Sequence, residues 1–186
     1  MDSLKNATLK VKLSLAFMST GLIMYISGIA SDQWVVGVSV NLNFDAAPGI
    51  TIRYEGLWFK CVQYLSVPIC GYHHTGWLNV CRVTAVLSML SGATAIGLAI
   101  GHVTVTRMKK DAIYIASIVL TFVSVECMKN CIIGFASNYD SLVPSGSPSW
   151  GFALPVVGLA MYSVAGILQI VSRHEARSEG TANAEV

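Results

Sequence analysis

The sequence is poor in charged residues. Asp, Glu, Lys and Arg together make up 12% of the 186 residues, whereas 54% are hydrophobic. Soluble domains carry about twice that charged fraction, so a soluble protein of this length would lack the polar surface to cover itself. The net charge is only +2, which gives no basic footprint for nucleic acid. The composition therefore favours a membrane protein built from a small bundle of helices.

Sequence motifs of catalysis are also missing. There is no nucleophile elbow, no phosphate-binding loop and no H-E-x-x-H zinc motif. No Cys-x-x-Cys pair occurs, which argues against a thiol oxidoreductase carried on four helices. Cys127 and Cys131 share a helix face but have no histidine nearby in sequence, and the adjacent His73 and His74 would point to opposite faces of a strand. We therefore predict a protein that is not an enzyme and holds no metal or cofactor.

Four long apolar runs account for most of the chain. Each is long enough to cross a hydrocarbon core about 30 Å thick at about 1.5 Å per residue. We expect an all-α membrane bundle with helices over residues 11–30, 78–105, 112–135 and 151–171. The first run has an alternative interpretation as a cleaved signal peptide, because Gly28 and Ala30 have the small-residue spacing of a cleavage site. Its apolar core, however, is longer than that of a typical signal peptide.

Basic residues concentrate on one side of these four runs. Lysines precede the first run, a basic turn covers residues 107–110, and two arginines follow the fourth run. The positive-inside rule then predicts cytoplasmic termini and two extracellular loops, over about 31–77 and 136–150. The tail from 172 to 186 is polar and is expected to be too short to fold. The whole chain is thus expected to form one four-span domain.

The first extracellular loop is the one long segment with an alternating pattern. Residues 34–40 alternate between large apolar and small or polar side chains, as in a half-buried strand. A turn-forming stretch over 41–49 interrupts the alternation, which then resumes. We expect a small antiparallel sheet of about four strands, the third running over 57–64 and the fourth over 67–72.

Cys61 and Cys70 fall on neighbouring strands of this predicted sheet. The loop lies on the oxidising side of the membrane in the predicted topology, so the two cysteines are expected to form a disulfide. Such a bond would stabilise the fold by about 2 to 3 kcal/mol on a loop-entropy estimate. The alternative, a pair of free thiols, would require the loop to face the cytoplasm.

The first loop and the helix after it also contain a characteristic order of residues: Trp34, Gly56, Leu57, Trp58, Cys61, Cys70 and Arg82. This order resembles the claudin signature, which is shared with peripheral myelin and epithelial membrane proteins, and the resemblance covers nearly the whole chain. It implies a left-handed four-helix bundle that carries an extracellular sheet, with the two cysteines bonded. Large amphipathic rings at a membrane boundary suit the seating of such a sheet on the helices.

The resemblance also implies partners. Claudins assemble side by side and across pairs of cells, and they seal or selectively open the space between epithelial cells. By resemblance, the first loop would line the paracellular path, and the second loop, around 139–144, would hold the protein of the opposing cell. Expected partners are the lipid bilayer and itself or other claudin-like proteins in cis and in trans. The terminal Val186 could also enter a PDZ groove, although the family ending Tyr-Val is absent.

Two features of the helices call for an interpretation. Ala93, Gly97 and Gly101 place a small residue at every fourth position of the second helix, which lets a neighbouring helix approach closely. We expect this stripe to pack within the bundle, with a dimer face as the alternative.

Glu126 and Lys129 lie three residues apart in the third helix, close enough to pair. We expect an interfacial pair near the outer boundary, and ion-coupled transport is the alternative.

Charges in the first loop oppose one another. Asp45 and Glu55 balance Arg53 and Lys60, which favours a barrier or an adhesive contact over a strongly selective pore. The sequence therefore predicts a claudin-like protein of cell–cell junctions in the plasma membrane. The alternative is a tetraspan auxiliary or regulatory subunit of another membrane protein in the same cell. The stretch from Cys70 to Arg82 is shorter than in typical claudins, which weakens the expectation that the protein polymerises into strands.

Overall fold

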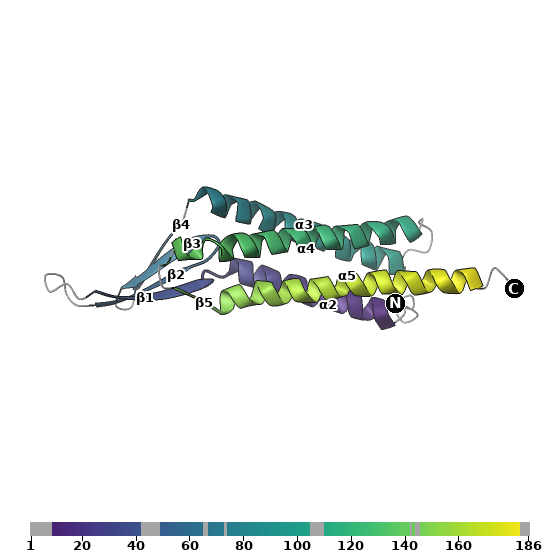
Figure 1. Cartoon of the computed structure of the whole chain (residues 1–186), viewed down its shortest axis with the longest axis horizontal. Coiled ribbons are helices and arrows are strands. Elements are labelled where there is room, and N and C mark those ends of the chain that lie inside the picture. The colour runs from purple at the N-terminus through teal and green to yellow at the C-terminus, as the bar shows by residue number, and fades with distance from the viewer. Residues whose placement is uncertain are drawn as a thin grey trace. The chain divides into compact units, whose positions relative to one another are not determined.

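The computed structural model describes residues 9–41, 49–64, 67–72, 74–104, 110–141, 143 and 146–182. These residues contain four long helices and a small sheet (Figure 1). The helices are α2 (Leu9–Ala30), α3 (Gly76–Thr104), α4 (Lys110–Ala136) and α5 (Trp150–Ala182). All four are long and apolar enough to cross a membrane. The predicted fold class, four apolar helices with a small antiparallel sheet after the first, is confirmed.

The sheet has five antiparallel strands in the order β4-β3-β2-β1-β5. Four of them lie between α2 and α3, and the fifth precedes α5. They are β1 (Val35–Asn41), β2 (Gly49–Glu55), β3 (Phe59–Tyr64), β4 (Val67–Tyr72) and β5 (Ser147–Pro148). The alternating pattern predicts the first four strands. It misses β5, because two residues, one of them a proline, are too few to show alternation.

The third strand begins later than its pattern predicts. The expected start is Leu57, but β3 begins at Phe59, and Leu57 and Trp58 form a bend instead. The backbone N–H of Gly56 donates to the carbonyl oxygen of Phe59 at 3.0 Å, which closes this bend. The prediction of a strand over 57–58 is therefore wrong, because these two apolar residues belong to a turn and not to the alternation of the sheet.

The fourth helix is longer than its apolar run. The hydropathy pattern predicts an end at Val171, but α5 continues to Ala182. A helix that has already formed adds residues at little cost, and Glu175 of this extension forms an ion pair with Lys10 of α2. The expectation of an unfolded tail is therefore wrong for residues 172–182, and residues 183–186 lie outside the described part of the chain.

The chain divides into two compact units. The first, which we call the helix unit, comprises Met1–Ile23, Leu87–Glu126 and Gly158–Val186. The second, the sheet unit, comprises Met24–Val86 and Cys127–Val157, and so contains the whole sheet with the adjoining ends of the four helices. All residues of the claudin-like signature lie in the sheet unit: Cys61 in β3, Cys70 in β4, Arg82 in α3, and the others in the connections that precede β1 and β3.

Polar side chains are buried in the helix unit. Gln169 is almost fully buried and donates from Nε2 to the sulfur of Met18 at 3.1 Å, while Thr121 donates to its Oε1 at 3.2 Å. The hydroxyl of Tyr162 donates to the carbonyl oxygen of Gly92 at 2.7 Å. In lipid, where no hydrophobic force drives helices together, interhelical hydrogen bonds of this kind support the packing. These bonds join helices α2, α3, α4 and α5 within the unit.

The small-residue stripe of α3 lies outside this packing. Ala93 and Gly97 are exposed, and a Cβ atom on Gly97 or Gly101 would meet no described atom within 4 Å. Close helix contacts occur at other glycines: a Cβ on Gly21 would lie 2.9 Å from the carbonyl oxygen of Gly158. The expectation that the stripe packs within the bundle is therefore wrong for the described residues. The face of α3 that turns inward carries Gly92 instead.

Candidate functional site

Trp34 joins the start of the sheet to the helices around it. Its ring is fully buried, and its indole N–H donates to the carbonyl oxygen of Gly28 at the end of α2, at 2.6 Å. The ring makes edge contacts with Phe135 of α4 and Phe152 of α5, with centroids 4.7 and 5.6 Å apart. An aromatic ring with its single donor satisfied is well suited to such a junction. Trp34 therefore fixes the first strand to three helices at once.

The backbone of Trp34 adds two further links. Its N–H donates to the carbonyl oxygen of Glu55 at 3.0 Å, and its own carbonyl oxygen accepts from Ser149 at 2.9 Å. Glu55 ends β2, and Ser149 lies between β5 and α5. The segment between α2 and α3 and the segment between α4 and α5 are therefore tied together at this one residue.

Arg82 of α3 holds the bend between β2 and β3. The guanidinium donates from Nε to the carbonyl oxygen of Leu57 at 2.9 Å, and from Nη2 toward that of Trp58 at 3.5 Å. Its Nη1 donates to Oδ1 of Asn79 at 2.9 Å. The same group lies 4.3 Å from the centroid of the Tyr72 ring, a cation–π distance. Arg82 thus connects α3, the bend and β4.

Gly56 and Leu57 allow the bend to lie against the segment after α2. A Cβ atom on Gly56 would lie 2.5 Å from the carbonyl oxygen of Ser31 and 2.6 Å from the Cα of Asp32. Only glycine permits so close an approach of two backbones. Leu57 is fully buried beside it. The Gly-Leu-Trp part of the signature therefore has a packing role, which alternation alone does not reveal.

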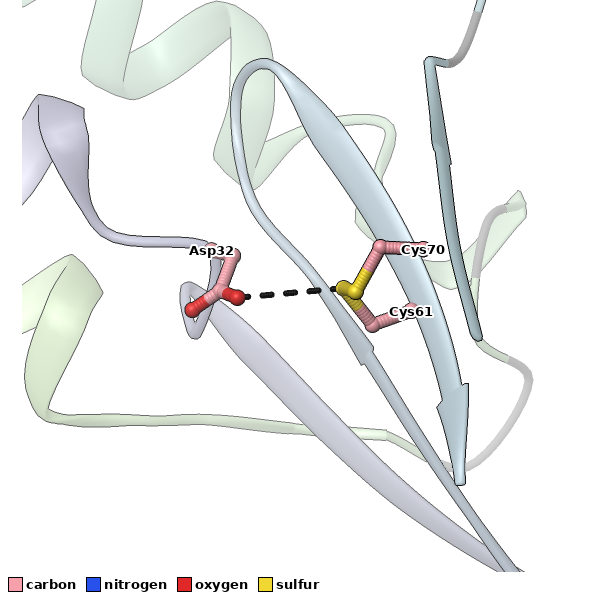
Figure 2. Close-up of side chains that lie close together, drawn as sticks. All are labelled: Asp32, Cys61 and Cys70. Atoms are coloured by element: carbon pink, nitrogen blue, oxygen red, sulfur yellow. Dashed lines mark hydrogen bonds between the residues drawn. A yellow bond between two sulfur atoms is a disulfide. The ribbon is translucent and has the colours of Figure 1, made fainter. Parts of the chain in front are cut away.

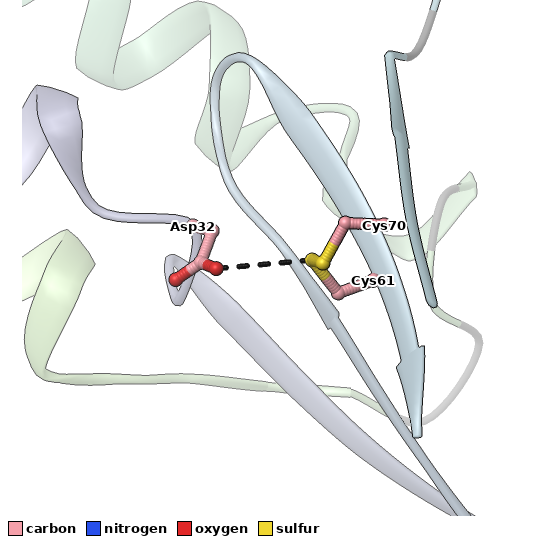
Figure 3. The surroundings of a disulfide bond; sticks show 3 residues. All are labelled: Asp32, Cys61 and Cys70. Carbon is pink, nitrogen blue, oxygen red and sulfur yellow. Dashed lines mark hydrogen bonds between the residues drawn. A yellow bond between two sulfur atoms is a disulfide. The ribbon is translucent and has the colours of Figure 1, made fainter. Parts of the chain in front are cut away.

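The predicted disulfide is present between Cys61 of β3 and Cys70 of β4 (Figure 2). The two residues are directly opposite each other in the strand register, with Cα atoms 4.1 Å apart. Cys61 is fully buried, whereas Cys70 is exposed. The Oδ2 of Asp32 lies 3.7 Å from the Sγ of Cys61 (Figure 3). Because a disulfide sulfur carries no proton, this is a close contact between a carboxylate and the bond, and not a hydrogen bond.

Asp32, Cys61 and Cys70 also have their potential metal-ligand atoms within 4.8 Å of one another. Among the described residues, no other group of three or more His, Cys, Asp or Glu side chains is close enough to hold a metal ion. The donor set does not fit a metal, because metal-binding cysteine acts as a thiolate and both sulfurs are already bonded to each other. His74 stacks edge-on against Tyr72 at 4.6 Å. His73 lies outside the described residues.

The second loop covers one face of β1. Val143 is buried, and a Cβ atom on Gly37 would lie 2.3 Å from its Cγ1. A Cβ on Gly146 would lie 2.6 Å from the Cγ1 of Val35. The alternating pattern does not predict this contact, although a glycine inside a strand is a signal for the close approach of another segment.

Two of the first-loop charges neutralise each other. Glu55 is 1% exposed, and its Oε1 lies 2.7 Å from the Nζ of Lys60 on the adjacent strand. The carboxylate of Glu55 is therefore buried against the ammonium of Lys60, which stays partly exposed. Asp45, the other acidic residue expected to balance the basic residues of this loop, lies outside the described residues.

The charged pair of α4 is located but its role stays a prediction. Glu126 is exposed and Lys129 is half-buried. The helix has 27 residues, a length of about 40 Å, and it continues beyond Lys129 to Ala136.

The chain matches one protein-family model over most of its length. None of the curated proteins compared with the chain matches it. The PMP-22/EMP/MP20/Claudin family matches residues 8–169, a range that includes the sheet, the disulfide and parts of all four helices. This multi-pass membrane protein belongs to the PMP-22/EMP/MP20/Claudin family.

Proposed function

We propose that this protein is a claudin-like component of cell–cell junctions in the plasma membrane, and that its extracellular loops form a barrier or an adhesive contact. Both termini lie in the cytoplasm in this proposal, and the sheet projects outside the cell. Two findings support this role: the chain belongs to the family, and it combines four helices long enough to span a membrane with a sheet held by a disulfide. The observation that carries the proposal is the uncovered surface of β4.

Strand β4 is exposed along its whole length. Three of its apolar side chains are at least half exposed: Val67 at 66%, Ile69 at 65% and Tyr72 at 50%. Phe59 of β3, which is paired with Tyr72, is also 50% exposed. Because successive side chains of a strand point to opposite faces, Val67 and Ile69 lie on one face of the sheet and Tyr72 with Phe59 on the other. Exposed apolar side chains outside a lipid-facing helix mark a surface that meets another protein. The sheet therefore offers an apolar contact surface on the β3–β4 side.

The edge of β4 also has backbone groups available for a partner strand. The short Cα–Cα distance of 4.1 Å identifies Cys61 and Cys70 as a non-hydrogen-bonded pair. The backbone N–H and C=O of Cys70 and Tyr72 consequently point away from β3, toward the open edge. The backbone of Pro68 also points away from β3. Because the N–H that proline lacks would not face β3, the pairing of the two strands is intact. An open edge of this kind can pair with a strand from a second copy.

Charge supports a barrier more than a selective pore. Glu55 and Lys60 are paired with each other, and the exposed residues of β4 carry no charge. Ion selectivity requires charges that line the path. We therefore propose contacts with the lipid bilayer and with copies of itself or other claudin-like proteins, in cis and in trans. Docking of Val186 to a PDZ scaffold concerns a residue outside the described part of the chain.

Transepithelial resistance tests the proposal. An epithelial layer that expresses the wild-type protein should show a higher resistance than the parent layer. Ile69→Asp, which places a charge on the apolar edge, should abolish the increase, whereas Asp111→Asn, an exposed change at the start of α4 and outside both loops, should retain it. An unchanged resistance with uniform surface staining, together with co-purification of a channel or receptor, would favour the auxiliary-subunit alternative.

A further inference from the structure

The two cysteines of the disulfide differ in exposure. Cys61 lies on an inner strand and is fully buried, whereas Cys70 lies on the edge strand β4 and is exposed. A thiolate that breaks a disulfide must approach one of the two sulfurs, and the rate depends on which sulfur is accessible. Access therefore favours attack at Cys70, with Cys61 as the leaving group.

A carboxylate lies beside the leaving group. Figure 3 shows Asp32 facing the disulfide, with its Oδ2 3.7 Å from the Sγ of Cys61. The position of Asp32 is fixed by its surroundings. The N–H of Ser31 donates to the carbonyl oxygen of Gly28 at 3.1 Å, and the N–H of Gln33 donates to the Oγ of Ser31 at 3.1 Å. These bonds hold the backbone on both sides of Asp32 in the turn that precedes Trp34.

We propose that Cys70 is the sulfur at which thiol reductants attack this bond, and that the carboxylate of Asp32 protects the bond by opposing the departure of Cys61. This role is independent of the proposed function in junctions. It concerns the persistence of the disulfide that joins β3 to β4. It assigns a role to Asp32, which is not one of the residues of the claudin-like signature.

The reaction proceeds in two exchanges. A reductant thiolate attacks the Sγ of Cys70 and forms a new sulfur–sulfur bond, while the bond between Cys61 and Cys70 breaks and its electron pair leaves on the Sγ of Cys61. A second reductant thiolate then attacks the reductant sulfur of this mixed disulfide and displaces the thiolate of Cys70. The two reductant thiols are oxidised to a disulfide, and the two protein thiolates take protons from water.

The carboxylate acts on the first exchange. Negative charge develops on the Sγ of Cys61 as the bond breaks, at 3.7 Å from the carboxylate oxygen. Like charges at that distance repel strongly in a partly buried site, where water screens them poorly. A thiol that is a poorer leaving group departs more slowly. Removal of the carboxylate charge should therefore accelerate reduction by about tenfold.

Reduction kinetics of the full chain in lipid nanodiscs test the inference. The chain is treated with 2-mercaptoethanol, an uncharged thiol, at one mildly alkaline pH, then quenched with acid and analysed by peptide mass spectrometry. Asp32→Asn keeps the shape of the side chain and should be reduced about tenfold faster than the wild type. Asp140→Asn, which removes an exposed carboxylate elsewhere in the sheet unit, should be reduced at the wild-type rate. Equal rates for Asp32→Asn and the wild type would overturn the inference.

A second measurement uses the wild-type chain alone, so it tests the direction of attack even if Asp32→Asn does not fold. Rapid quenching early in the reaction captures the mixed disulfide with 2-mercaptoethanol. The adduct should reside on Cys70, with Cys61 recovered as the free thiol. An adduct that resides mainly on Cys61 would contradict the proposed direction of attack.

Discussion

The guanidinium of Arg82 donates a hydrogen bond of 2.9 Å to the carbonyl oxygen of Leu57. This bond connects the first turns of α3 to the bend that separates β2 from β3. It explains in physical terms why an arginine at the start of a membrane helix accompanies a Gly-Leu-Trp sequence in the preceding loop. A buried cation at this position supplies donors to carbonyl groups that the bend leaves outside the strand ladder.

Arg82→Ala should destabilise the sheet unit by about 2 to 3 kcal/mol, because hydrogen bonds from a charged group are lost and buried carbonyls are left unpaired. Arg82→Lys should be intermediate, because an ammonium keeps the charge but lacks the planar fork. Thermal unfolding in detergent measures both effects. Arg177→Ala, at an exposed position of α5, provides the control. If Arg82→Ala has the same melting temperature as Arg177→Ala, the role of the guanidinium is refuted.

Gly56→Ala should also be strongly destabilising. Its new methyl group would lie 2.5 Å from the carbonyl oxygen of Ser31, and both partners are backbone. Gly71→Ala is the matched control on β4, because a Cβ there meets no described atom within 4 Å. The expected loss is about 1 to 3 kcal/mol for Gly56→Ala, and no loss for Gly71→Ala. Chemical denaturation of the two proteins side by side decides the matter, and equal stabilities would disprove the close approach.

Trp34→Phe should lower stability more than Trp150→Phe. Trp34 is fully buried, and its indole N–H bonds the carbonyl oxygen of Gly28, so the change leaves a small cavity and removes one of the two hydrogen bonds that this carbonyl accepts. Trp150 is 56% exposed and its indole N–H bonds the side chain of Gln33. We expect a difference of about 2 kcal/mol between the two variants. Thermal melting that ranks them in the opposite order would contradict the anchoring role of Trp34.

Glycines on the membrane helices should separate into two groups. Gly21→Ala should destabilise the helix unit, since its Cβ would lie 2.9 Å from the carbonyl oxygen of Gly158. Gly97→Ala should be neutral or stabilising by up to about 1 kcal/mol, because alanine favours a helix and no described atom is within 4 Å of the new Cβ. Unfolding in detergent tests the contrast under conditions that keep the chain monomeric. A destabilised Gly97→Ala monomer would restore the expectation that the stripe packs within the bundle.

Hydropathy and strand alternation predict most of the architecture. Four apolar runs are long enough to require four membrane helices, and the alternation between Trp34 and Tyr72 requires a sheet. The disulfide also follows from sequence, because Cys61 and Cys70 fall on adjacent strands. These features depend on patterns that repeat over many residues, and such patterns are not easily altered by tertiary contacts.

Features that depend on tertiary contacts could not be predicted in the same way. The helix face on which Ala93 and Gly97 lie depends on how α3 is rotated, and small residues alone do not determine that rotation. The bend at Leu57 looks like a strand because its residues are apolar, although Arg82 and Ser31 make it a turn. Asp32 has no sequence signal at all, because its proximity to Cys61 arises from the packing of the α2 end against the bend at Gly56.

The most direct test of the proposed junction role is imaging of a mosaic culture. Cells that lack junction strands are made to express the tagged protein and are mixed with cells that do not express it. The account predicts enrichment at borders between two expressing cells, no enrichment at borders with non-expressing cells, and loss of enrichment in Cys61→Ser. Uniform staining of all borders, with no effect of the contacting cell, would contradict the claim that the extracellular sheet joins neighbouring cells.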